Sequence, residues 1–246
     1  MQLLNEEVKN QIKEIFNKEV KNPVKVILFT RAFNCETCQY AEQLLKEVHE
    51  AVPEKLQIEI VSTADPEGQE KAKQYGLDPD RVPAFVILDK DGKDRGIHYI
   101  GLPAGLEFST FINGVILASV DEIPVDDRVK EMVNNITQPL DVRVFVTTSC
   151  GYCPQAAITA YQFAVLSPNV VANVYDAQEN PDLSQKYQVV GVPKIVITKQ
   201  GSDEPVVEFV GAQPPEYFLS YLIQASQKLE KGGLEGAGGS GLIITP

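Results

Sequence analysis

Two copies of one sequence pattern, each containing a Cys-x-x-Cys pair, constrain this chain more than any other feature. The pairs are Cys35/Cys38 and Cys150/Cys153, and they account for all four cysteines among the 246 residues. Each pair follows a short run rich in β-branched residues, which is typical of a strand. After each pair the apolar residues recur at helical spacing, which predicts an amphipathic helix that starts beside the cysteines.

The order of the later elements also repeats. From the Val-Pro step before the third strand-like run to a later glycine there are 18 residues in both copies, 83 to 101 and 193 to 211. Strand–helix–strand connections favour parallel pairing of the first two strands of each copy. Each half is therefore predicted to run α-β-α-β-α-β-β-α. The predicted units cover residues 1–121 and 122–230, and a glycine-rich tail covers 231–246.

This order of features resembles the thioredoxin and glutaredoxin superfamily. Two such units in one chain look like the glutaredoxin-like protein disulfide oxidoreductase family of hyperthermophiles. The resemblance implies an α/β fold of two tandem thioredoxin-like units, with central mixed β-sheets flanked by helices and able to join into one sheet. It also implies reduction, formation or isomerisation of disulfides in protein substrates. No cofactor is expected beyond the redox-active disulfides, and electrons are expected from a thioredoxin-reductase-type flavoenzyme.

The position of each cysteine predicts its role. At a helix N-terminus, free backbone N–H groups and the helix dipole stabilise a thiolate. We therefore assign Cys35 and Cys150 as attacking thiols, and Cys38 and Cys153, one turn further on, as resolving thiols. The acidic Glu36 beside Cys35 should raise its pKa. The second pair encloses only Gly151-Tyr152, so Cys150 is predicted to have the lower pKa.

Further site residues follow from the resemblance. It implies that Pro83 and Pro193 are cis and lie against the cysteines, and that Val82 and Val192 offer backbone groups to an extended substrate. Tyr152 is predicted to face solvent and contact substrate. Thioredoxins also carry a buried acid six residues before the attacking cysteine, and here Phe29 and Val144 occupy those positions. A thioredoxin-type proton acceptor is therefore not expected there, and Arg81 is expected to be an ordinary surface charge.

Two alternative functions compete for the cysteines. The four thiolates could bind zinc, but zinc ribbons separate their pairs by about 15–20 residues, whereas residues 39–149 lie between these two pairs. The chain could also be a non-catalytic chaperone or binding module with structural disulfides. Disulfides that close so small a loop at a helix start are rarely structural. We therefore expect an enzyme and no metal site.

Composition excludes some partners. The net charge of −12 disfavours nucleic acid, because an acidic chain repels phosphate backbones. No run approaches about 18 consecutive apolar residues, so no membrane contact is expected. No secretory signal is apparent, and a cytoplasmic location is expected. The tail 231–246 combines glycines with the apolar 242–244, which predicts a flexible segment that packs on a sheet edge or joins a homo-oligomer.

Overall fold

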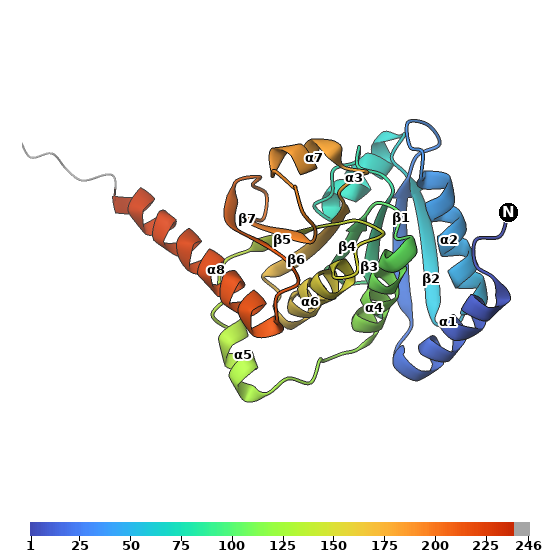
Figure 1. Cartoon of the computed structure of the whole chain (residues 1–246), viewed down its shortest axis with the longest axis horizontal. Helices are drawn as coiled ribbons and strands as arrows, with labels where there is room; N and C mark the ends of the chain where they lie inside the picture. Colours follow the sequence, from blue (N-terminus) through green and yellow to red (C-terminus); the bar gives the residue numbers. More distant parts are fainter. Residues whose placement is uncertain (239–246) are drawn as a thin grey trace, which may run out of the picture.

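The computed structural model describes residues 1–238, with side chains to residue 233, and its core is one eight-stranded mixed sheet (Figure 1). The strand order is β2-β1-β3-β4-β6-β5-β7-β8. The first half contains α1 (Glu6–Glu19), β1 (Val24–Thr30), α2 (Cys38–Ala51), β2 (Leu56–Ser62), α3 (Pro66–Gln74), β3 (Ala84–Leu88), β4 (Asp94–Ile100), the short 3₁₀ helix η1 (Gly105–Glu107) and α4 (Phe108–Ser119). The second half contains α5 (Asp127–Val133), β5 (Leu140–Val146), α6 (Cys153–Leu166), β6 (Val170–Asp176), α7 (Pro181–Lys186), β7 (Lys194–Lys199), β8 (Pro205–Val210) and α8 (Pro215–Gly238).

The repeat in the sequence is a repeat in the sheet. In the first half β1 pairs parallel with β2 and antiparallel with β3, which pairs antiparallel with β4. In the second half β5, β6, β7 and β8 pair in the same way. The central strands β1 and β5 are nearly continuous apolar runs because helices cover both faces of the sheet. The predicted element order and the parallel first pair are confirmed.

A parallel pair of strands joins the two halves. Strand β4 pairs with β6 from Ile97 opposite Ala172 to Ile100 opposite Tyr175. Helices α4 and α6 pack on each other over this joint, and Figure 1 shows them side by side on one face of the sheet. The hydroxyl of Tyr161 on α6 donates a hydrogen bond to the His98 carbonyl of β4 at 2.7 Å. The expectation that the two sheets join into one is therefore confirmed.

Gly101 follows β4 at the point where the two halves come closest. Its φ is +132°, a value that L side chains rarely adopt. A Cβ atom there would lie 2.6 Å from Asp176 Cβ and 2.8 Å from Glu179 Oε2. Gly211 holds the corresponding position after β8, with φ +94°, but a Cβ atom there would meet nothing closer than Gln213 Nε2 at 3.7 Å.

The glycine-rich segment differs in part from the expectation of a flexible tail. Residues 231–238 continue α8, which does not end near Leu229 as its apolar spacing suggested. Each glycine weakens a helix by only about 1 kcal/mol relative to alanine, so a long preceding helix can extend through several of them. Figure 1 shows the end of α8 extending away from the body of the protein. Residues 239–246 lie outside the described residues, so the expected packing or oligomerisation through them stays a prediction.

We expect Gly101→Ala to destabilise the protein more than Gly211→Ala. Backbone strain should lower the free energy of unfolding by about 1–3 kcal/mol at either position. At Gly101 the new methyl group must also displace Asp176 or Glu179. Urea unfolding of the two variants measures the difference, and equal losses would show that the close approach of the two halves adds nothing.

Candidate active sites

Each cysteine pair lies between a central strand and the helix that follows it. Cys38 begins α2 and Cys153 begins α6. Both pairs form disulfides, with Cα–Cα distances of 5.5 Å and 5.4 Å. Cys38 and Cys153 are buried, at 2% and 0% exposure, whereas Cys35 and Cys150 are only half-buried. In each disulfide, therefore, the first sulfur is the one that a substrate can reach.

The Val-Pro steps lie beside these accessible sulfurs. Both the Val82–Pro83 and the Val192–Pro193 peptide bonds are cis. Cys35 Sγ lies 3.3 Å from the Val82 carbonyl oxygen, and Cys150 Sγ lies 3.8 Å from that of Val192. The structure thus brings the residues predicted for substrate binding to both disulfides. A glycine N–H after the fourth strand of each half fixes each proline by donating to its carbonyl, from Gly101 and from Gly211.

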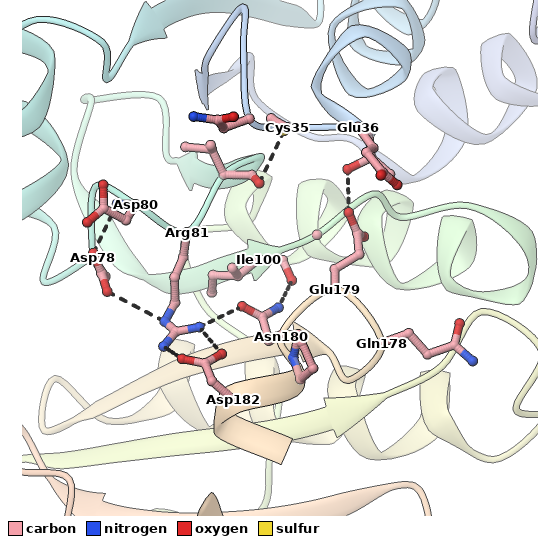
Figure 2. A pocket seen from close by; sticks show the side chains of 15 residues that line it. Cys35, Glu36, Asp78, Asp80, Arg81, Ile100, Gln178, Glu179, Asn180 and Asp182 are labelled. Carbon is pink, nitrogen blue, oxygen red and sulfur yellow. Dashed lines mark hydrogen bonds and ion pairs between the residues drawn. The ribbon is translucent and has the colours of Figure 1, made fainter. Parts of the chain in front are cut away.

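The first site opens into a cleft between the two halves of the chain (Figure 2). Its volume is about 670 Å³, within the range of ligand-binding pockets. Thr37, inside the first cysteine motif, donates a hydrogen bond to Glu179 of the second half. The other oxygen of Glu179 accepts from the Leu102 N–H at 2.7 Å. Burial raises the pKa of Glu179, and the hydrogen bond from Thr37 opposes the increase.

Arg81 also joins the two halves at this cleft, so its expected role as an ordinary surface charge is wrong. Its guanidinium donates two hydrogen bonds to the carboxylate of Asp182, at 2.9 Å and 2.5 Å. It also donates to Asn180 Oδ1 at 3.2 Å and lies 3.6 Å from Asp78. Hydrogen bonding from Arg81 lowers the pKa of Asp182 to about 2. No local pattern could reveal this role, because Arg81 and Asp182 are 101 residues apart.

The second site has more open surroundings. Tyr152 is 72% exposed, in agreement with its predicted solvent-facing position. Val190, two residues before Val192, is wholly exposed. A Cβ atom added to Gly151 or to Gly191 would meet nothing within 4 Å. The second disulfide therefore lies near exposed apolar side chains, in contrast with the charged cleft at the first.

A buried acid is present at a place that sequence comparison with thioredoxins does not indicate. Phe29 and Val144 are buried apolar residues, as expected at the thioredoxin acid positions. Glu107 of η1, however, is fully buried. Burial raises the pKa of Glu107 to about 7, although the nearby hydroxyls of Thr110 and Tyr99 lower it in part. An acidic residue at a helix start resembles an ordinary surface position, so the sequence carries no signal for its burial.

Glu107 lies where the first half contacts the second cysteine loop. The neighbouring Leu106 N–H donates to the carbonyl of Thr148, two residues before Cys150, at 2.9 Å. Gly105 packs so closely on the same carbonyl that a Cβ atom would lie 2.7 Å from its oxygen. The segment 105–107 therefore supports the loop of the second site from the first half.

Two further findings concern metal sites and membranes. Among residues 1–238, no group of three or more His, Cys, Asp or Glu side chains is arranged to hold a metal ion. The four cysteines are thus not gathered into one tetrahedral site. Within the same described part of the chain, no helix combines the length and apolar character needed to cross a membrane.

Comparison with known proteins places the fold among thioredoxins. Residues 140–224 match the family described as thioredoxin domain. The crystal structure of a protein disulfide oxidoreductase from Aeropyrum pernix has a TM-score of 0.78 and 28% identity, and the match covers 91% of this chain and 94% of that one. A structure from the alkylhydroperoxide reductase of Enterococcus faecalis has the same TM-score at 21% identity, covering 90% and 100% of the two chains, and shows similarity of fold alone.

Curated relatives match over shorter regions. A Schistosoma mansoni protein named "Probable protein disulfide-isomerase ER-60" is 30% identical over 173 residues, which cover 63% of this chain and 35% of that protein. The chain spans about a third or less of the length of the curated relatives it matches.

We expect Glu107→Gln to stabilise the protein near neutral pH. Folded Glu107 binds its proton up to a pH of about 7, whereas the ordinary pKa of this side chain is 4.5. Between these values the unfolded chain binds fewer protons than the folded one, so the free energy of unfolding contributed by Glu107 falls as pH rises. The fall amounts to about 3 kcal/mol. Urea unfolding at pH 4.5 and pH 8 should show this loss in the parent and not in Glu107→Gln. The exposed Glu54→Gln is the control and should behave like the parent.

Proposed function

We propose that this chain, a tandem thioredoxin-fold protein and a thiol–disulfide oxidoreductase, exchanges disulfides with other proteins at both of its Cys-x-x-Cys pairs. One observation carries the proposal. In each half, an accessible sulfur lies next to the carbonyl that precedes a cis proline, and its buried partner begins a helix. The similarity to the Aeropyrum pernix protein disulfide oxidoreductase over most of both chains supports the same activity.

The disulfide form can oxidise a substrate dithiol in two steps. A substrate thiolate attacks Cys35 Sγ, the bond to Cys38 breaks, and Cys38 leaves as a thiolate stabilised by the N-terminus of α2. The second substrate thiolate then attacks the substrate sulfur in the mixed disulfide. This forms the substrate disulfide and releases Cys35 as a thiolate. The reverse sequence reduces a substrate disulfide, and Cys150 and Cys153 act in the same way at α6.

Extended substrate chains are proposed to bind along the segments that precede the prolines. Val82 and Val192 are half-buried, and each lies beside an accessible sulfur. Their backbone groups can pair with a substrate strand, and this mode of binding is independent of substrate sequence. The exposed ring of Tyr152 offers an additional apolar contact at the second site.

The electron source and location complete the proposal. We propose a thioredoxin-reductase-type flavoenzyme as the reducing partner, which the match to reductase-named relatives supports. A cytoplasmic location rests on the cysteine usage, since all four cysteines belong to two redox pairs and none to a scattered disulfide framework. The hyperthermophilic source rests on the family resemblance. A non-catalytic binding module is the alternative that the following experiment excludes.

Removal of both pairs should abolish disulfide reduction. With all four cysteines changed to Ser, we expect insulin reduction by dithiothreitol to fall to the rate without protein, a loss of roughly 100-fold or more. The two double variants, Cys35→Ser/Cys38→Ser and Cys150→Ser/Cys153→Ser, each keep one site and should each retain activity. Full activity in the four-cysteine variant would show that the protein is a binding module.

We expect the pKa of Cys150 to be lower than that of Cys35. Glu36 is exposed and directly follows Cys35, and a charge about 5–6 Å away changes a pKa by about half a unit in water. The pH dependence of iodoacetamide alkylation measures both values in the two double variants. Glu36→Gln should lower the pKa of Cys35, whereas Glu50→Gln, at the far end of α2, should not. A lower pKa at Cys35 than at Cys150 would contradict the assignment.

A further inference from the structure

The first redox site is completed by the other half of the chain. The cleft that contains Cys35, hereafter the inter-unit cleft, is lined from the second half by residues 178–182. Asn180 is buried there and donates to the Ile100 carbonyl of β4 at 3.5 Å. Figure 2 shows Glu179 directed toward Glu36 and the loop of the first cysteine motif. A substrate at Cys35 therefore contacts both halves of the chain.

The inter-unit cleft carries an excess of negative charge. Among the described residues that line it, the single cationic side chain is Arg81, which is held by Asp182, Asp78 and Asn180. The acidic side chains that line it are Glu36, Asp78, Asp80, Glu179 and Asp182. Within the part of the chain that the structure describes, neither Glu36 nor Glu179 has a cationic partner within 4 Å. These two carboxylates thus remain available to a ligand.

The corresponding positions at the second site lack this charge. Glu36 and Thr37 of the first motif correspond to Gly151 and Tyr152 of the second. Asp80, two residues before the first cis Val-Pro valine, corresponds to the fully exposed Val190. The residue after the second cis proline is the cationic Lys194, where the first half has Ala84. The two redox sites therefore present different surfaces around the same geometry of sulfur and proline.

We propose that the inter-unit cleft selects positively charged polypeptide segments, so that Cys35 exchanges disulfides preferentially where Lys or Arg flanks the substrate cysteine. This inference rests on the proposed function and adds the substrate class of one site. The location of the site is given by the reactive sulfur and the backbone beside it, and the carboxylates decide which segments approach it. A concave surface lined by one sign of charge concentrates ligands of the opposite sign. Glu179 of the second half acts here as a specificity-determining residue.

The exchange needs no further reactant once the protein is reduced. The Cys35 thiolate attacks the substrate disulfide, forms a mixed disulfide and releases one substrate thiolate. The Cys38 thiolate then attacks Cys35 Sγ, which closes the protein disulfide and releases the second substrate thiolate. Two electrons pass to the substrate. A lysine beside the attacked cysteine lies within reach of Glu36 or Glu179 during the first step.

The test compares two peptide disulfides in single-turnover reduction by the pre-reduced full chain with Cys150→Ser/Cys153→Ser. The peptides are identical except that Lys or Glu flanks one cysteine. We expect the Lys peptide to react about threefold to tenfold faster at 10 mM salt. The ratio should approach one at 1 M salt, because the screening length falls from about 30 Å to about 3 Å. Glu36→Gln and Glu179→Gln should each lower the ratio, and Glu54→Gln should leave it unchanged.

The ratio of two peptide rates separates charge recognition from thiol reactivity. A change in the pKa of Cys35 alters both rates equally and leaves the ratio constant. Equal rates at low salt, or a ratio insensitive to salt and to both cleft variants, would overturn the inference. The same Lys preference in the Cys35→Ser/Cys38→Ser chain would also overturn it, since the preference would then come from the net charge of −12. If the parent protein reduces neither peptide nor insulin, the proposed function itself fails.

Discussion

The pairing of β4 with β6 is the contact on which the rest of this structure depends. It turns two four-stranded sheets into one and removes an exposed edge from each. The apolar core is then continuous across both halves, with β1 and β5 in the same cluster as the helices between them. Because strands in register and packed helices fix both distance and orientation, the two redox sites are held at fixed positions on one rigid frame.

This joint also makes the two sites unequal. The ends of β4 and β6 lie side by side, so the loop after β6 reaches the first cysteine motif and places Glu179 on Thr37. The strand equivalent to β4 in the second half is β8, which lies at the edge of the sheet. Within residues 1–238, no further unit lies beyond β8 to cover the second motif. A tandem arrangement of identical units would therefore give one enclosed site and one open site even before the sequences diverged.

The sequence predicts what depends on local pattern and fails where distant segments meet. Strand and helix order, the cysteine positions and the cis prolines follow from periodicity and from the repeated motif, and the structure agrees with them. The joining of the sheets follows only from the resemblance. The roles of Arg81 and Glu179 escape prediction, because they depend on contacts across 101 and 142 residues. The helical segment 231–238 escapes it because its glycines favour a flexible tail, whereas the continuity of α8 extends the helix through them.

Acidic side chains occupy different positions here than in the thioredoxin pattern, and this affects how the sites can work. The strand positions under the cysteines are apolar, at Phe29 and Val144. Acids instead approach from the joint, with Glu179 at the first motif and Glu107 in the segment that supports the second cysteine loop. Each is therefore positioned by packing between the halves and not by its own strand. The same β4–β6 pairing that stabilises the fold thus also sets the electrostatic surroundings of both disulfides, so a change at the joint alters redox chemistry without touching a cysteine.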